Sequence, residues 1–329
     1  MKPHKKILAA AICILLSFPA SCKTSQPAAL TQINVACFPN ITHAQALLMK
    51  GQGTLEKAFG DGVKVHWVTF NAGPSEIEAL FAGDIDIGYI GPVPAITGYI
   101  QSSGDLRIIA GASNGGSALV ARDGAGVNSP KDLAGKKVAV PQIGNTQHLS
   151  LLALLSANGL APTTSGGDVS VAAANNADIA NLMDQGNIDA ALVPEPWASI
   201  LERGGNAKVV LDYDQVDPNG IPSTAVVIVR KDFLDARPDA VAKFMEAHKS
   251  ATDYINNNLA DAMRIINDQI TQMTQKPIDE NILAGAFKRL QITYEIPSGS
   301  IMAFANTCLE QKIIPNLPDS KLIDYTYVK

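Results

Sequence analysis

Six short polar segments of the chain have the composition of an anion-binding site. They are rich in Asn, Ser, Thr, Gly and Pro, and none contains Lys or Arg. The segments cover residues 38–43, 72–75, 91–94, 113–117, 144–148 and 194–197. Backbone N–H groups and hydroxyls of such loops can bind a small, compact anion without a bidentate guanidinium group. Helix capping explains each single polar residue equally well, Ser113 included, so the prediction rests on the set of six.

Glu195 and Trp197 stand out because a carboxylate next to an aromatic ring can hold a cation or an amine. The alternative is that Glu195 caps a helix or forms a salt bridge while Trp197 packs in the core. His43 and His148 each follow an Asn/Thr turn. We interpret these two histidines as hydrogen-bonding side chains of a site wall rather than as metal ligands or catalytic bases.

The elements that would position these segments alternate between strands and helices. Strands are expected over 33–37, 63–70, 85–90, 106–112, 117–122, 137–140, 169–172, 189–193, 207–211 and 223–230. Helices are expected to begin near Thr42, Ser75, Gly91, Asn145, Asn176 and Pro196, and the chain reads as mainly helical from Pro238. Thr42 with Gln45, and Ser75 with Glu78, have capping-box spacing. The alternation predicts an α/β fold with mostly parallel sheets.

An internal echo indicates two similar lobes. Gly83–Ile90 contains a helix stop, an Ile-Asp strand start and an apolar strand, followed by a Pro-rich turn. Gly186–Val193 repeats this order about 100 residues later. Asn145–His148 likewise repeats the polar turn at Asn40–His43. In such α/β sheets, ligands bind at the carboxyl ends of the strands, where helix N-termini meet.

The amino-terminal residues read as an export signal. Three lysines precede Ile7–Phe18, an apolar run of 12 residues that is too short to span a bilayer. Pro19–Cys22 resembles a bacterial lipoprotein cleavage box, which implies cleavage before Cys22 and a lipid on its sulfur. Ordinary secretory cleavage near Ser21 is the alternative. We assign 1–22 to the signal peptide and 23–31 to a tether, and expect an extracytoplasmic protein.

Composition narrows the class of protein. With 329 residues, about two domains are expected, and a formal net charge of −5 argues against a nucleic-acid-binding protein. Beyond residue 22 only Cys37 and Cys308 remain. An oxidising compartment permits a bridge between them, and the alternative, which we favour, is that they are unpaired, buried residues.

Four motifs in order carry a family resemblance: Phe38–His43, Gly83–Gly88, Gly144–Thr146 and Glu195–Trp197. Together they resemble the solute-binding proteins of ABC importers for taurine, aliphatic sulfonates, nitrate and related solutes. The resemblance covers nearly all of 32–329. It implies a two-lobed type II periplasmic-binding-protein fold, each lobe a mostly parallel sheet flanked by helices. The implied lobes are 32–121 with 231–329, and 122–230. The crossings between them are placed near 121–123 and 225–230.

The resemblance also implies site residues. The sulfonate-binding turn of the family corresponds to Gly144, Asn145 and Thr146, and its first-lobe loops correspond to Asn40, His43, Pro92 and Ser117. In taurine-type members an acidic residue meets the amine, and Glu195 matches that position. The residues around Glu195 depart from those of taurine proteins, which leaves the ligand open.

Enzyme motifs do not fit the expected elements. Gly111–Gly115 satisfies the GxSxG pattern, but a strand rather than a helix is expected after it. The fold also resembles that of thiamine-pyrimidine synthases, whose Cys-rich run is missing here. We therefore expect no enzyme activity, no cofactor and no metal.

The sequence predicts a monomeric, lipid-anchored receptor that captures a small anionic or zwitterionic solute and passes it to an ABC permease with its ATPase subunit. The alternative is a receptor for a thiamine pyrimidine precursor or other heterocycle that stacks on Trp197 and pairs with Glu195.

Overall fold

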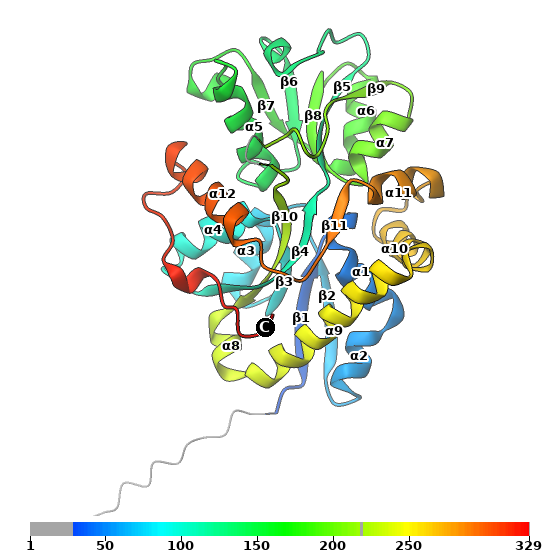
Figure 1. Ribbon diagram of the computed structural model, residues 1–329, viewed down its shortest axis with the longest axis vertical. Helices are drawn as coiled ribbons and strands as arrows, with labels where there is room; N and C mark the ends of the chain where they lie inside the picture. The colour runs from blue at the N-terminus through cyan, green and yellow to red at the C-terminus, as the bar shows by residue number, and fades with distance from the viewer. Residues whose placement is uncertain (1–28, 218–219, 329) are drawn as a thin grey trace, which may run out of the picture.

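Two β-sheets organise the residues that the computed structural model describes, 29–217 and 220–328. The first sheet has the strand order β11-β4-β10-β3-β1-β2 and the second has the order β7-β6-β8-β5-β9. The strands are β1 (Gln32–Cys37), β2 (Lys64–Thr69), β3 (Ile87–Ile90), β4 (Leu106–Gly115), β5 (Ser117–Arg122), β6 (Lys137–Val140), β7 (Ser170–Ala173), β8 (Ala190–Pro194), β9 (Ala207–Leu211), β10 (Ser223–Arg230) and β11 (Leu290–Ile292). Each sheet with its helices forms one lobe, and Figure 1 shows the two lobes one above the other. Cys22 and the rest of the predicted leader lie outside the described residues.

Strand direction follows a common rule in both lobes. In the first sheet β1 to β4 run the same way, while β10 is antiparallel to both β3 and β4. In the second sheet β6 to β9 run the same way, while β5 is antiparallel to both β8 and β9. The strand that reaches each sheet from the other lobe is therefore reversed, and in the first sheet the short edge strand β11 is antiparallel to β4 as well. The predicted α/β class with mostly parallel sheets is confirmed.

The internal echo marks equivalent strands. Asp86, just before β3, pairs with Arg230 at the end of β10 at 3.0 Å. Asp189, just before β8, pairs with Arg122 at the end of β5, also at 3.0 Å. Each aspartate also accepts a backbone hydrogen bond at the start of the neighbouring parallel strand, from Asn34 in one lobe and from Lys137 in the other. The repeated Ile-Asp step thus joins the reversed strand to the parallel ones.

Helices cover both faces of each sheet. They are α1 (Ala44–Gln52), α2 (Thr54–Phe59), α3 (Gly73–Ala82), α4 (Pro92–Gln101), α5 (Thr146–Ala157), α6 (Ile179–Asp184), α7 (Trp197–Arg203), α8 (Lys231–Ala236), α9 (Pro238–Asn257), α10 (Leu259–Thr274), α11 (Glu280–Phe287) and α12 (Ser298–Glu310). Alternate residues of β10 belong to opposite cores: Val227 packs with residues of α1, α9 and α10, and Val226 packs with residues of α3, α4 and α12. This two-residue period is that of a strand buried on both faces.

The crossings between the lobes lie elsewhere than predicted. Because β5 belongs to the second sheet, the first crossing is at Gly115–Gly116, not near 121–123. Because β10 belongs to the first sheet, the second crossing lies between the end of β9 at Leu211 and the start of β10 at Ser223, not at 225–230. Gly115 and Gly116 have φ of +73° and +71°, a region that glycine enters at little cost. The predicted lobe boundaries assigned β5 to the first lobe and β10 to the second, whereas the structure places β5 in the second sheet and β10 in the first.

The two predicted capping boxes are wrong. Thr42 lies inside the 3₁₀-helix η1 (Ile41–His43), and the Gln45 side chain instead donates to the carbonyl oxygen of Ala112 at 2.8 Å. Helix α3 begins at Gly73, so Ser75 is already helical, and its hydroxyl accepts a hydrogen bond from Gln142. The capping-box spacing did not reveal that Gln45 and Ser75 form hydrogen bonds with residues far away in the sequence.

Cys37 and Cys308 are buried and unpaired, as predicted. Burial raises the pKa of each thiol to about 12. Within the described part of the chain, none of the helices has the length and apolar character that crossing a bilayer requires.

Gly111 on β4 permits a close approach of two backbones. A Cβ at this position would lie 2.1 Å from the carbonyl oxygen of Glu295. We expect Gly111→Ala to lower the free energy of unfolding by about 1–3 kcal/mol, because the backbone neighbour cannot rotate away. Gly62→Ala, where a Cβ meets nothing within 4 Å, is the matched control. Urea unfolding of both variants checks this, and equal stabilities would contradict it.

Candidate ligand-binding cleft

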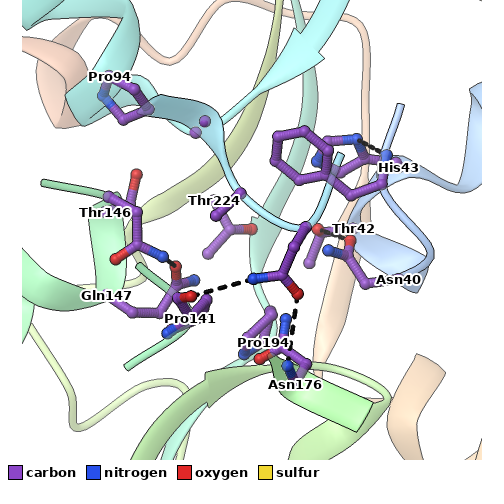
Figure 2. A pocket seen from close by; sticks show the side chains of 16 residues that line it. Asn40, Thr42, His43, Pro94, Pro141, Thr146, Gln147, Asn176, Pro194 and Thr224 are labelled. Atoms are coloured by element: carbon purple, nitrogen blue, oxygen red, sulfur yellow. Dashed lines mark hydrogen bonds between the residues drawn. The ribbon is translucent and has the colours of Figure 1, made fainter. Parts of the chain in front are cut away.

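A narrow cleft, with room for about 20 Å³, lies between the two lobes and is lined from both sides. Figure 2 shows residues of η1 facing residues of α5 across it, with Thr224 of β10 between them. The lining residues are Phe38, Asn40, Thr42, His43, Asn71, Ala72, Gly73, Gly91, Pro94, Pro141, Asn145, Thr146, Gln147, Asn176, Pro194 and Thr224. Five of the six polar segments singled out in the sequence contribute to this lining; residues 113–117 do not.

The first-lobe wall is built by the turn after β1. The Thr42 hydroxyl donates to the side-chain oxygen of Asn40, and the Ser113 hydroxyl donates to the Thr42 carbonyl oxygen at 2.9 Å. Because the Asn40 oxygen is engaged, its amide nitrogen is the group left to donate elsewhere. Ser113, a predicted site residue, therefore holds the wall from behind rather than lining the cleft.

His43 lines the cleft as a neutral side chain. Its Nδ1 accepts a hydrogen bond from the Phe38 backbone N–H at 3.1 Å, and the two rings stack with centroids 4.3 Å apart. Burial lowers the pKa of His43 to about 3. An Nδ1 that accepts cannot carry a proton, so geometry and desolvation agree. The prediction of a hydrogen-bonding wall residue fits this environment.

The second-lobe wall is the N-terminus of α5. Asn145 is the N-cap, and its side-chain oxygen accepts from the His148 backbone N–H at 2.8 Å. Gly144 does not line the cleft; its backbone N–H donates to His148 Nδ1 at 3.1 Å, and its φ is +86°. Burial lowers the pKa of His148. The turn thus fixes the first amides of α5, whose partial positive charge favours an anion.

Thr146 meets the other lobe. Its hydroxyl oxygen accepts a hydrogen bond from the Val93 backbone N–H at 3.4 Å. A Cβ on Gly91 would lie only 2.3 Å from that oxygen. Pro92, a predicted site residue, is buried in α4, and its neighbours Gly91 and Pro94 line the cleft instead. The start of α4 and the start of α5 therefore touch directly across the cleft.

Gln147 and Ser117 form a supporting pair. The Gln147 side chain donates to the Ser117 hydroxyl at 2.9 Å and accepts from the Asn145 side chain at 2.9 Å. Ser117 does not line the cleft, although it was a predicted site residue. It orients Gln147, which the sequence analysis did not select.

Two further asparagines were missed. Asn71 follows β2 and Asn176 follows β7, the edge strands in equivalent positions of the two sheets. The Asn71 side chain donates to the Pro141 carbonyl oxygen at 3.0 Å and accepts from the Asn176 backbone N–H at 3.4 Å. The internal duplication could have predicted this pair, because the residues that follow equivalent strands of the two lobes lie at the same cleft.

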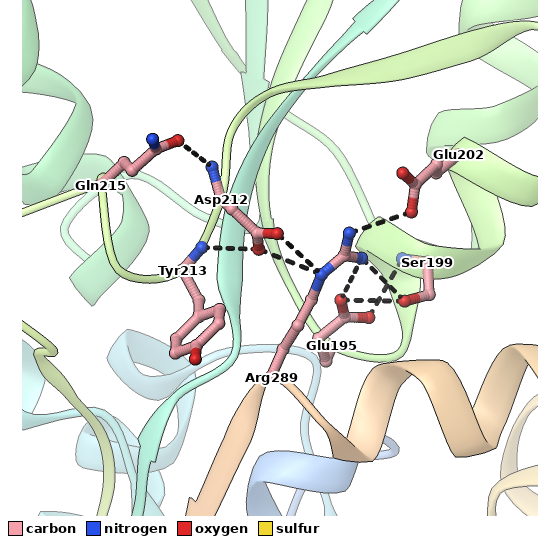
Figure 3. A network of polar contacts seen from close by, with 7 residues as sticks. All are labelled: Glu195, Ser199, Glu202, Asp212, Tyr213, Gln215 and Arg289. Atoms are coloured by element: carbon pink, nitrogen blue, oxygen red, sulfur yellow. Dashed lines mark hydrogen bonds and ion pairs between the residues drawn. The ribbon is translucent and has the colours of Figure 1, made fainter.

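Glu195 does not reach the cleft. Its side chain is 0% exposed, and it accepts from the Ser199 backbone N–H at 3.0 Å and from the Ser199 hydroxyl at 2.9 Å. Arg289 lies 3.0 Å away and also contacts Glu202 and Asp212, as Figure 3 shows. Burial raises the pKa of Glu195, against the opposing effects of Ser199 and Arg289. Glu195 therefore forms a salt bridge, which was the alternative to its predicted contact with an amine.

Trp197 begins α7 and packs in the second lobe's core with Val193 and Ile179. It is buried and does not line the cleft. The described residues contain no group of three or more His, Cys, Asp or Glu side chains placed to hold a metal ion.

Comparison with known proteins identifies the family. The model of the NMT1-like family matches residues 26–267, well over half of the chain. The chain belongs to the NMT1-like family. Among curated relatives, the taurine-binding periplasmic protein of Escherichia coli (strain K12) is 34% identical over 222 residues, covering 67% of this chain and 65% of that protein. A Bacillus subtilis (strain 168) protein named for binding aliphatic sulfonates is 25% identical over 338 residues, covering 100% and 96%.

Solved structures share the fold of this NMT1-like chain. The alkanesulfonate-binding protein of Xanthomonas axonopodis pv. citri, bound to MOPS, has a TM-score of 0.76 at 20% identity, covering 91% of this chain and 100% of that one. The periplasmic nitrate-binding protein of Synechocystis PCC 6803 has a TM-score of 0.69 at 17% identity, covering 89% and 84%. The predicted resemblance to sulfonate and nitrate receptors is confirmed at the level of fold and family.

The neutral His43 gives a prediction for pH. Below pH 6.5 the unfolded chain binds a proton at this histidine, whereas the folded chain does not until about pH 3. This site therefore stabilises the fold above pH 6.5 and loses that stabilisation as pH falls. Between pH 6 and 5, His43→Asn should flatten the pH dependence of the unfolding free energy by about 1 kcal/mol per pH unit. Urea unfolding checks this, with the exposed His66→Asn as the control. A slope unchanged from wild type would contradict it.

Arg289 gives a prediction for stability. Arg289→Met would leave the buried Glu195 carboxylate without its cationic partner and should cost about 3 kcal/mol. Adding Glu195→Gln should recover part of this loss, because the two effects are coupled. Arg264→Met, which removes exposed ion pairs with Asp261 and Asp268, should cost less than about 1 kcal/mol. Strictly additive losses in urea unfolding would contradict the coupling.

Proposed function

We propose that this chain is an extracytoplasmic solute-binding receptor of an ABC importer, and that its interlobe cleft captures a small anion such as a sulfonate. The observation that carries the proposal is the pairing of two helix starts, at η1 and α5, across a cleft lined by amide and hydroxyl groups. The names of the taurine- and sulfonate-binding relatives support the same class of solute.

The physical basis is electrostatic. The first N–H groups of α5 have no partner within the helix, and they carry the positive end of its dipole. Thr146 and Gln147 add hydroxyl and amide groups at the same edge, and Asn40 adds an amide opposite. Oxygen atoms of a compact anion can accept several such bonds at once.

Lobe closure would couple capture to delivery. The lobes touch through Thr146 and Val93, and the Ile41 backbone N–H donates to the Glu195 carbonyl oxygen at 3.2 Å. A ligand that contacts both walls binds the closed arrangement better and shifts the population towards it. Rotation at Gly115–Gly116 and at Asp212, after the end of β9, would separate the walls. The surface that the receptor presents to the permease and its ATPase subunit would then depend on whether a ligand is bound.

The proposal includes a lipid on Cys22, a tether from that residue to the first lobe, and a monomeric state. The lipoprotein-like box in the sequence supports the anchor. The periplasmic names of the relatives support a location outside the cytoplasm.

The thiamine-precursor alternative required a ring stacked on Trp197 and paired with Glu195. The structure buries both side chains away from the cleft, so this alternative loses its two contacts. A non-enzymatic role is consistent with the binding-protein names of the relatives. Cys37, buried with a pKa near 12, does not offer a thiolate nucleophile.

Calorimetry tests the proposal with taurine, short alkanesulfonates, sulfate and nitrate. We expect at least one of these anions to bind and Asn40→Ala to weaken its binding at least about tenfold, since a hydrogen bond to a charged group contributes about 1.5–3 kcal/mol. Asn175→Ala, at an exposed position outside the cleft, is the control and should bind as the wild type does. Absence of binding for every anion would refute the proposal.

A further inference from the structure

The cleft is uncharged on the protein side. Of the described residues that line it, none is Asp, Glu, Lys or Arg, and its one histidine is held neutral. An ammonium group on a ligand would therefore find no carboxylate among these lining residues. This matters because taurine carries an ammonium two carbons from its sulfonate.

Glu195 is the acidic residue that the family resemblance assigned to an amine. It follows the cleft residue Pro194 directly in the chain, yet its carboxylate is turned into the protein. One of its oxygens accepts from the Arg289 guanidinium and the Ser199 hydroxyl, and the other accepts from the Ser199 backbone N–H. Both oxygens are thus satisfied without a ligand.

Arg289 is itself held in place from the second lobe. Its guanidinium contacts Glu202 and Asp212 at 3.0 Å in addition to Glu195, as Figure 3 shows. Turning Glu195 towards the cleft would separate its carboxylate from the Arg289 guanidinium. Breaking such a buried ion pair is strongly destabilising. The cluster keeps Glu195 unavailable to a ligand amine.

The hydrogen-bond acceptors among the described side chains that line the cleft are neutral, and one of them is without a partner there. The side-chain oxygen of Asn176 is buried and has no hydrogen-bond partner within the described structure. One amide oxygen can satisfy a hydroxyl, which has a single proton to donate. It cannot compensate a buried ammonium, which has three donors and a full charge.

We infer that this receptor selects organic anions that carry no ammonium group and discriminates against taurine. The inference rests on the proposed function and narrows its solute class: hydroxyalkyl- and alkylsulfonates are bound, and the aminoalkylsulfonate is disfavoured. The chain would then differ in solute from the taurine-binding relative that is 34% identical to it.

Isethionate and taurine form a matched pair of ligands, because they differ only by a hydroxyl in place of the ammonium. Competition calorimetry on the wild-type chain should give a dissociation constant for taurine at least about tenfold higher than that for isethionate. Equal affinities, or tighter binding of taurine, would overturn the inference while leaving the proposed function standing. Failure of both ligands, of unsubstituted alkanesulfonates and of sulfate and nitrate would refute the proposed function itself.

A charge placed at the cleft wall should shift the preference towards taurine. Asn176→Asp supplies the missing carboxylate, and we expect it to change the taurine-to-isethionate affinity ratio at least about tenfold in favour of taurine. Asn175→Asp makes the same change one residue earlier, at an exposed position outside the cleft, and should leave the ratio unchanged. The same shift in both variants would contradict the assignment to the cleft. If Asn176→Asp does not fold, the wild-type ratio alone decides.

Discussion

The arrangement depends on one constraint: each sheet incorporates a strand that has come from the other lobe. β5 and β10 enter their sheets from the interlobe side and therefore run against the parallel strands. The carboxyl ends of the parallel strands in both sheets consequently face the same cleft, together with the helix starts that follow them. Asp86 and Asp189 fix the far ends of the reversed strands through Arg230 and Arg122. Duplication thus produces a candidate binding cleft at the junction of the two halves.

The described residues that line the cleft include no Asp, Glu, Lys or Arg. The chain has enough ionisable residues for a conventional anion site, yet the lining is made of amides, hydroxyls, glycines and prolines. Arg289 lies near the crossing, where it neutralises Glu195 rather than meeting a solute. Fixed dipoles can stabilise an anion without paying to desolvate a protein cation. Because these dipoles recognise the anionic group alone, discrimination between solutes depends on the other functional group that each solute carries.

The sequence predicted the elements well where the signal was local. Alternating apolar strands, the echo at Gly83 and Gly186, and the N-cap Asn145 all depend on neighbours within a few residues. It failed where the partner is distant: Gln45 bonds a residue 67 positions away, and Glu195 meets Arg289, 94 positions away. A carboxylate beside an aromatic looks the same in the sequence whether it faces a ligand or a buried guanidinium. Residues that line a cleft and residues that hold it from behind are likewise separated only by the fold.

A crystal structure of the chain grown with a short alkanesulfonate would test the central claim most directly. The account predicts the sulfonate between the η1 turn and the start of α5, within hydrogen-bond distance of the amide or hydroxyl groups of Asn40, Thr146 or Gln147, with Glu195 still bound to Arg289. A sulfonate seated on Arg289 or on a surface lysine, with the interlobe cleft unchanged, would contradict it.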